Sequence, residues 1–330
     1  MIDARLALAL EGGLDLPLNG QIYVVSPPTE AALEVLPKER TVLIDGFKPA
    51  HDIWLHRGFA VEIETLNSAA GVILCLPRSK IQARSMIADA MALTSGWVVI
   101  DGQKTDGVDS ILKEMRKRVP LSAPISKAHG KLFWCDAPEP AAFEDWRVGP
   151  ALTSGGFWTA PGVFSADGID PASELLASAL PDKLGRNVAD LGAGWGFLSA
   201  HVLARPEVSN VHLVEANHMA LECARRNVTD PRAVFHWADA TEWKTSERMD
   251  TVVMNPPFHV SRSADPGIGQ AFVQAAAKIL SPQGHLWLVA NRHLPYEQTL
   301  RAAFMNVNEV GSDARFKVFQ ATRPKRLGRP

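Results

Sequence analysis

Cysteine is scarce in this chain. The 330 residues include only Cys75, Cys135 and Cys223, and none of them lies close to another. This spacing excludes a C-x-x-C metal motif or a disulfide framework, and it is typical of a reducing compartment. Long hydrophobic runs are also missing, because no stretch approaches the roughly 18 apolar residues that a membrane-spanning helix needs. The N-terminal apolar run is too short for a secretory signal. We therefore expect a soluble, cytoplasmic protein without a metal site.

A strong net charge is absent as well. The formal charge of −2 gives no overall attraction to nucleic acid or to an anionic membrane. Basic residues nevertheless cluster locally, in "KEMRKR" at 113–118 and along the segment after Asp313. Such clusters are either solvated faces or contact sites for a polyanion, and the pattern alone leaves both interpretations open.

Short β-rich runs alternate with helical patterns, which indicates βαβ units and mostly parallel sheets. The length favours two domains. We expect one domain over 1–137, a linker over 138–149, where "PEPAAFEDWRVG" is rich in Pro and acid, and a second domain over 150–330. The predicted strands of the first half are 21–26, 41–45, 60–64, 71–76 and 96–101. Those of the second half are 187–191, 210–215, 233–237, 250–255, 285–291, 306–310 and 315–321.

A glycine loop follows the strand predicted at 187–191, in "NVADLGAGWGFLSAHVLA". Gly192, Gly194 and Gly196 allow a sharp turn and a close approach to a ligand, because they carry no Cβ. A dinucleotide fingerprint needs a further glycine at 197, where Phe197 stands instead. The pattern D-x-G-x-G-x-G, beginning at Asp190, resembles the first motif of class I S-adenosylmethionine-dependent methyltransferases. In that family the acid faces the methionine end of the cofactor.

Two further acids end the next predicted strands. Glu215 closes "VHLVE" and can accept hydrogen bonds from both ribose hydroxyls of a nucleoside. Asp239, with Ala240 beside it, follows the third strand. In the class I family an acid at this place accepts from the adenine amino group, and neighbouring apolar atoms sandwich the ring. Three acids at strand ends in register, together with the glycines, predict an S-adenosylmethionine site.

The fourth strand ends on "NPPFH", residues 255–259. An amine on a planar ring is a poor nucleophile, and two acceptors aimed at its N–H bonds hold it for in-line attack. The Asn255 side-chain oxygen and the Pro256 carbonyl are expected to be these acceptors. Proline restricts the residue before it to an extended conformation, and Phe258 offers a face on which a base can stack. Pro257, His259 and Arg292 are candidate substrate contacts, and for His259 a structural role stays open.

Several longer segments carry a more specific resemblance. "NPPFH", "LVANRHLPYEQTL", "RFKVFQA" and "PGVFSADGIDPASELL" resemble the ribosomal RNA guanine-N2 methyltransferases of the RsmC/RlmG type. The resemblance implies two tandem class I methyltransferase domains, Rossmann-like and doubly wound, of which the first is degenerate and serves as an RNA-recognition or scaffold domain. It further implies methyl transfer from S-adenosylmethionine to the N2 amine of a guanine in ribosomal RNA, with ribosomal RNA or a ribosomal subunit as partner. We expect small-subunit 16S rRNA as the substrate and a monomeric enzyme.

The residues of the first half agree with a lost activity. Its first strand runs into "PPTE" without a glycine, and Leu76-Pro77-Arg78 falls where Asn-Pro-Pro would be expected. A leucine side chain cannot accept a hydrogen bond from a base.

Other functions stay open on sequence alone. The acceptor could be a guanine of large-subunit RNA, a DNA adenine or a protein glutamine. A nicotinamide-dependent oxidoreductase would use a similar sheet, but Phe197 and the Asn-Pro-Pro loop count against it. A non-catalytic RNA-binding or ribosome-assembly protein would not need the intact motifs of the second half.

Overall fold

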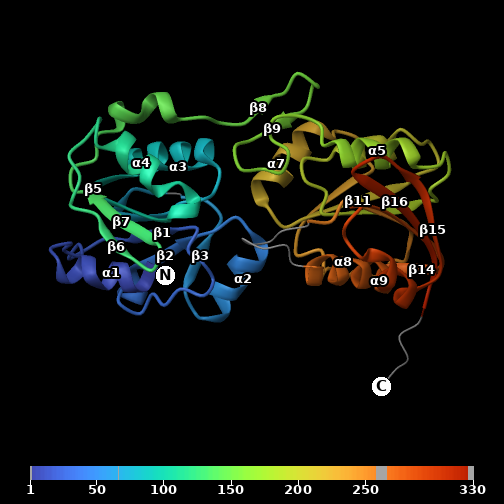
Figure 1. The fold of residues 1–330 in the computed structure, drawn as a ribbon, viewed down its shortest axis with the longest axis horizontal. Helices are drawn as coiled ribbons and strands as arrows, with labels where there is room; N and C mark the ends of the chain where they lie inside the picture. Colours follow the sequence, from blue (N-terminus) through green and yellow to red (C-terminus); the bar gives the residue numbers. More distant parts are fainter. Residues whose placement is uncertain (1, 66, 258–265, 326–330) are drawn as a thin grey trace. The chain divides into compact units, whose positions relative to one another are not determined.

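The computed structural model describes residues 2–65, 67–257 and 266–325. The chain forms two compact units, one of residues 1–150 with 160–162 and one of residues 151–159 with 163–330 (Figure 1). No helix within the described ranges has the length and apolar character required to cross a membrane.

The first unit contains four α-helices and seven strands in its described part. Its helices are α1 (Ile2–Glu11), α2 (Lys48–His56), α3 (Lys80–Leu93) and α4 (Val108–Met115), with short 3-10 helices at Lys38–Arg40, Lys104–Asp106 and Pro140–Trp146. Its strands are β1 (Ile22–Val25), β2 (Thr41–Ile44), β3 (Ala60–Glu62), β4 (Ala69–Cys75), β5 (Thr94–Gln103), β6 (Ile125–Lys127) and β7 (Gly130–Cys135).

The second unit repeats this plan. Its helices are α5 (Pro171–Ala179), α6 (Phe197–Leu203), α7 (His218–Asn227), α8 (Pro266–Ile279) and α9 (Tyr296–Ala303). Its main strands are β10 (Asn187–Leu191), β11 (Asn210–Glu215), β12 (Ala233–Trp237), β13 (Met249–Met254), β14 (Leu280–Asn291), β15 (Phe304–Ser312) and β16 (Phe316–Pro324). A small two-stranded sheet pairs β8 (Ala151–Leu152) with β9 (Trp158–Thr159).

Both seven-stranded sheets have the same strand order. The first runs β3-β2-β1-β4-β5-β7-β6, and the second runs β12-β11-β10-β13-β14-β16-β15. The first five strands in each order are parallel. The sixth, β7 or β16, is antiparallel to both of its neighbours, so the last strand, β6 or β15, runs in the direction of the first five. The chain order reverses between β1 and β4 and between β10 and β13, which is the switch point where open parallel sheets bind ligands. The inserted antiparallel strand distinguishes this order from the 3-2-1-4-5-6 order of dinucleotide-binding domains.

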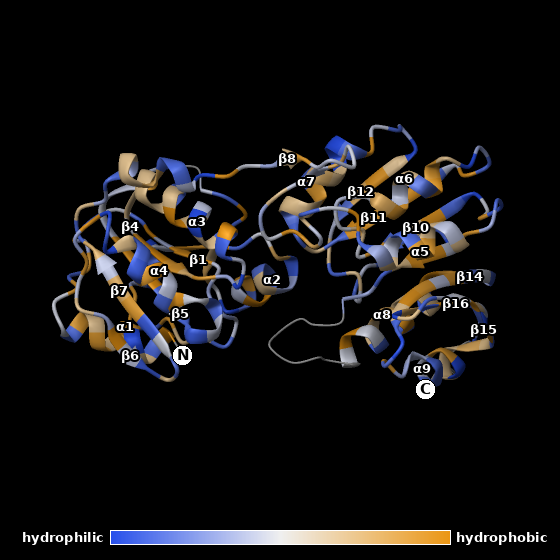
Figure 2. Ribbon diagram, turned by 45° about the horizontal axis from the view of Figure 1, so that its top comes forward, coloured by the Kyte–Doolittle hydropathy of each residue, from blue (hydrophilic) through white to orange (hydrophobic). Residues whose placement is uncertain are grey.

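Helices cover both faces of each sheet, so the central strands are buried on both sides and read as continuous apolar runs. In the first unit, α3 and α4 pack with Phe133 and Leu74 on one face, and α1 and α2 pack with Val24 and Ile73 on the other. In the second unit, α8 and α9 share a core with Leu191 and Val252. Figure 2 shows apolar colours along these strands and mixed colours on the helices.

Two features of the first unit differ from the prediction. The antiparallel pair β6 and β7 was not among the predicted strands, although Phe133 is fully buried. The segment expected to be a linker forms a 3-10 helix whose Phe143 and Trp146 are buried in the core beside α3. Burial of two aromatic side chains three positions apart stabilises the Pro-rich segment against the first unit. An extended linker would leave such side chains exposed.

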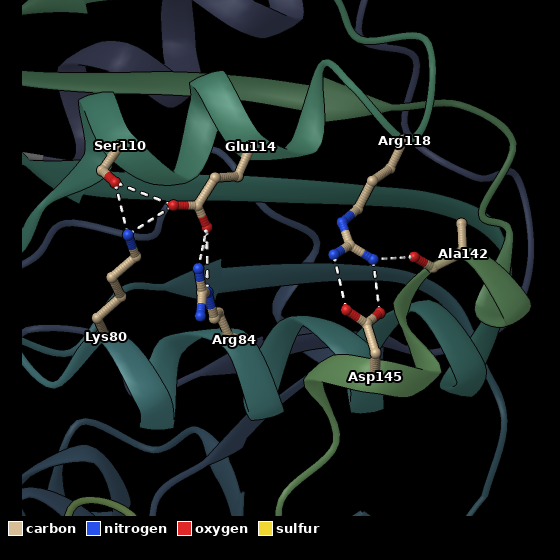
Figure 3. A network of polar contacts seen from close by, with 7 residues as sticks. All are labelled: Lys80, Arg84, Ser110, Glu114, Arg118, Ala142 and Asp145. Carbon is tan, nitrogen blue, oxygen red and sulfur yellow. Dashed lines mark hydrogen bonds and ion pairs between the residues drawn. The ribbon is translucent and has the colours of Figure 1, made fainter.

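An ion-pair network ties α3, α4 and the 3-10 helix together (Figure 3). Lys80 Nζ and Arg84 Nη2 donate to the carboxylate of Glu114 at 2.5 and 2.8 Å, and Arg118 forms two parallel bonds with Asp145. Partial burial raises the pKa of Glu114, but the hydrogen bonds from Lys80 and Arg84 outweigh this effect and lower it to about 2. The positive charge of Lys80 is therefore paired with a carboxylate inside the first unit.

We expect Glu114 to stabilise the chain fully above about pH 4.5 and to lose this contribution as the pH falls through about 2, because its folded-state pKa is depressed. Glu114→Gln should lower stability at pH 7 by about 1–2 kcal/mol after solvent screening. The measurement is the thermal unfolding midpoint of both proteins from pH 3 to 7. Glu144→Gln, on an exposed i,i+3 pair with Arg147, is the control. A difference in unfolding midpoint between wild type and Glu114→Gln that stays constant with pH would contradict the lowered pKa of Glu114.

Candidate active site

Three of the predicted site residues, Asp190, Glu215 and Asn255, lie at the carboxyl ends of neighbouring strands in the second sheet. β10, β11 and β13 are parallel neighbours, with Asp190 aligned to Leu213 on one side and to Val253 on the other. Their carboxyl ends therefore open at the same edge, at the switch point of the sheet.

The glycine loop leaves β10 in a conformation that only glycine adopts readily. Gly192, Gly194 and Gly196 have φ values of 74°, 55° and 91°, in the left-handed region. A Cβ on Gly196 would lie 2.9 Å from a methyl carbon of Val228, so this position also lacks room for a side chain. The loop leads directly into α6, and its backbone is exposed to the cavity described below.

Glu215 holds this loop in place. Its Oε2 accepts from the backbone N–H of Gly194 at 2.8 Å, and its Oε1 accepts from Asn217 N–H at 2.7 Å. Burial raises the pKa of Glu215, while these backbone hydrogen bonds oppose the rise. The carboxylate thus joins the end of β11 to the loop after β10.

Asp190 lies beneath the loop with no exposed surface. Ser199 Oγ donates to its Oδ2 at 2.7 Å, whereas the buried Oδ1 has no hydrogen-bond partner within residues 2–65, 67–257 and 266–325. Burial, reinforced by the charge of Glu215, raises the pKa of Asp190 to about 7 despite the Ser199 bond. Asp190 was predicted to contact the cofactor directly, but it is not among the residues that line the cavity.

Asp239 lies in the turn that follows β12. Its Oδ1 accepts from Thr241 N–H at 2.8 Å and from Thr241 Oγ1 at 2.7 Å, so one oxygen shapes the turn. Ala240 is buried in the core that α8 covers. Both therefore lie after the third parallel strand, as the sequence predicted.

Asn255 directly follows β13, and its amide is held by two acceptors. Its Nδ2 donates to Asp170 Oδ2 at 2.8 Å and to Ser173 Oγ at 2.9 Å. Its Oδ1 is buried and has no hydrogen-bond partner among the described residues. Pro256 is buried and Pro257 is exposed. The predictions for Phe258 and His259 fall outside the described residues.

A cavity opens between the glycine loop and Asn255. Its lining includes Gly192, Gly194, Asn255, Asp170 and the exposed ring of Phe164. Arg292 does not line it. This exposed residue instead donates from Nε to the carbonyl oxygen of Asp313 at 2.9 Å.

The residues of this cavity that sequence reasoning missed include Phe164, Asp170 and Ser173. The string "IDPAS" carries a helix-start signal, with Asp170 as N-cap and Pro171 at the first helical position. That signal predicts α5 but not its contact with a residue 85 positions away.

Within the described part of the chain, no three His, Cys, Asp or Glu side chains are grouped so as to hold a metal ion. Cys75, Cys135 and Cys223 are buried and free. The absence of a metal from the function stays a prediction.

Comparisons with known proteins agree with this geometry. The profile of the methyltransferase small domain family matches residues 154–320. Two proteins named ribosomal RNA small subunit methyltransferase C are similar to the chain. That of Hahella chejuensis is 28% identical over 93% of this chain and 95% of its own length, and that of Shewanella sp. (strain MR-4) is 30% identical over 75% of each.

A solved structure covers both units. It is described as the T. thermophilus 16S rRNA N2 G1207 methyltransferase (RsmC) in complex with AdoMet and guanosine. It matches with a TM-score of 0.80 at 25% identity, over 97% of this chain and 92% of that chain.

The sheet order, the glycine loop and the Asn-Pro-Pro edge define a class I methyltransferase. More particularly, the chain belongs to the methyltransferase small domain family, among the ribosomal RNA small subunit methyltransferases C.

Asp190 should make the stability of the second unit depend on pH. Because its folded-state pKa is raised to about 7 from an ordinary value of 3.8, stability falls as the pH rises between these values and then levels off. Asp190→Asn removes this dependence. The thermal unfolding midpoint of the variant should improve relative to wild type from pH 4 to pH 7, by the equivalent of roughly 2–4 kcal/mol. A difference independent of pH would refute the assignment.

Proposed function

We propose that the chain transfers a methyl group from S-adenosylmethionine to the N2 amine of a guanine in 16S ribosomal RNA. The observation that carries the proposal is the Oδ1 of Asn255, a buried acceptor that no group in the described part of the chain satisfies, beside the cavity that the glycine loop lines. An unsatisfied buried acceptor is costly to keep, and a substrate N–H is the group that satisfies it.

The residues present fit S-adenosylmethionine. Gly192 and Gly194 allow close approach at the cavity wall. Glu215 at the end of β11 and Asp239 after β12 do not line this cavity, and they would offer the lone pairs that their backbone hydrogen bonds leave free. These acceptors suit a ligand with ribose hydroxyls and an amino-substituted base. Asp190 on β10 accepts from Ser199 and thereby joins the strand before the loop to the helix after it. When bound, the cofactor supplies an electrophilic methyl group.

Asn255 and Pro256 prepare the amine for methylation. The Asn255 oxygen accepts one N–H of the amine and the Pro256 carbonyl accepts the other, which orients the nitrogen lone pair and favours its pyramidal form. The nitrogen becomes cationic during transfer, and its proton is then acidic enough to leave without a strong base. Phe258 as a stacking platform and His259 as a base or phosphate contact stay predictions.

The names of the relatives support 16S rRNA as the substrate. The T. thermophilus structure is a complex with AdoMet and guanosine, and its description names the N2 position of a 16S guanine. A guanine inside a helix cannot reach a cavity at a sheet edge, so the base must be looped or flipped out. The monomeric state and the cytoplasmic location stay predictions.

We propose that the first unit does not catalyse methyl transfer. Leu76 follows β4 as Asn255 follows β13, and its buried side chain cannot accept a hydrogen bond. After β1, Ser26 and Pro27 replace the glycine loop, and Trp54 Nε1 donates to the carbonyl oxygen of Pro27 at 3.4 Å. The same fold therefore lacks both halves of the site.

This unit is better suited to binding RNA. Lys113, Arg116 and Lys117 are exposed at the end of α4, and Lys80 is already paired with Glu114. Three such cations contacting phosphates would make RNA affinity fall steeply with salt.

The test of the proposed function is transfer of labelled methyl from S-adenosylmethionine to unmodified small subunits, large subunits and their free RNAs. The product is digested to nucleosides. Label in N2-methylguanosine from small-subunit RNA is expected. Label in adenosine or in protein would overturn the proposal, and so would label confined to large-subunit RNA.

Asn255→Ala should lower kcat by about 10²–10³-fold, because it removes an acceptor that acts on charge developing in the transition state. The dissociation constant for S-adenosylmethionine, measured by calorimetry, should not change. Asn291→Ala, at the carboxyl end of neighbouring β14, is the matched control and should keep wild-type kcat. Equal activity of wild type and Asn255→Ala would exclude the proposed role.

Glu215→Gln should weaken S-adenosylmethionine binding by about 10–100-fold, because the amide replaces one of two charged acceptors that hold the loop. Calorimetric titration measures this loss. Glu242→Gln, on the exposed turn after β12, serves as the control. Unchanged affinity in Glu215→Gln would show that Glu215 does not support the cofactor site.

A further inference from the structure

We propose that Asp170 and Ser173 are positioning residues that determine which way the amide of Asn255 faces, and thereby make the site select a hydrogen-bond donor on the substrate. The inference rests on the proposed function, because it assigns the orientation of the group that would receive the guanine amine. Neither residue was predicted as part of the site from the sequence.

The amide nitrogen of Asn255 is fully committed. It carries two N–H bonds, and it donates to Asp170 Oδ2 at 2.8 Å and to Ser173 Oγ at 2.9 Å. A flipped amide would place its oxygen against the Asp170 carboxylate, where two acceptors would meet without a proton between them. The observed orientation is therefore the one that the surroundings favour, and it leaves Oδ1 as the free end of the amide.

Asp170 itself is held rigidly. It is the N-cap of α5, and the Oδ2 that receives Asn255 also accepts the backbone N–H of Ser173 at 2.8 Å. Pro171 at the first helical position fixes the backbone beside it. The start of α5 thus supplies both acceptors from a single turn, and Ser173 is buried there.

The Asp170 carboxylate also affects the charge on the amide. A negative group that accepts from Nδ2 polarises the amide and increases the negative charge on Oδ1. This favours the methylated nitrogen, which becomes cationic in the transition state. The arrangement should therefore act more on kcat than on binding.

The orientation also selects between groups on the base. The O6 and N7 atoms of guanine are acceptors, whereas its N2 amine is a donor. With both N–H bonds of Asn255 committed to α5, the side chain offers only an acceptor toward its free end. A guanine that presented its O6 carbonyl would place one acceptor against the Asn255 oxygen, with no hydrogen bond between them. The site therefore favours a guanine that presents its N2 amine.

Two variants test this while keeping the helix start. Ser173→Ala removes one acceptor with a residue that favours helices. Asp170→Ser keeps an N-cap side chain but is too short and uncharged to hold Asn255. On unmodified small subunits, each should lower kcat by about 10–100-fold and leave the dissociation constant for S-adenosylmethionine within twofold. Ser173→Thr, which keeps the hydroxyl, should recover most of the loss.

Ser79→Ala is the control, because it removes the side-chain cap of α3 in the first unit and should leave kcat unchanged. An active wild type with unchanged kcat in both test variants would overturn the inference and leave the proposed function standing. An equal loss in Ser79→Ala or in Ser173→Thr would also overturn it, because the effect would then be a general one of helix stability. A wild type that methylates no guanine would overturn both.

Discussion

The hydrogen bond from Gly194 N–H to the carboxylate of Glu215 connects two strands that the chain order separates by a helix. Glu215 can reach the loop only because β10 and β11 are parallel neighbours whose carboxyl ends lie at one edge. This hydrogen bond stabilises the loop conformation in which its glycines are left-handed. The backbone in that conformation forms one wall of the cavity that Asn255 also lines. Burial of Asp190 beneath the loop is a consequence of the same arrangement.

The two units show that the same fold can occur with and without the residues of a functional site. Both sheets have the same strand order and the same switch point, and both cores are formed by helices on two faces. Within the described residues, the second unit alone has left-handed glycines directly after its first strand and an amide after its fourth. In the first unit, the exposed Ser26 and the buried Leu76 occupy those places. Fold alone therefore does not locate the function.

The sequence predicted the parallel strands well, because buried strands are short, apolar and bounded by turn residues. It also predicted that Glu215 and Asn255 lie at strand ends. It could not predict the contact of Asn255 with Asp170, because periodicity carries no information about pairs far apart in the chain. The segment Pro140–Trp146 was predicted to be a linker because it is rich in proline and acidic residues. It forms a 3-10 helix with two buried aromatic side chains. Likewise, Asp190 was expected at the cavity surface, and only the packing of α6 shows that it lies below.

The central claim is that the oxygen of Asn255, and not its nitrogen, receives the substrate amine. A crystal structure of the chain with S-adenosylhomocysteine and guanosine tests it most directly. The account predicts the guanine N2 within about 2.7–3.2 Å of Asn255 Oδ1, with Nδ2 still bonded to Asp170 and Ser173. A guanine that presents O6 to Asn255, or an amide released from α5, would contradict it.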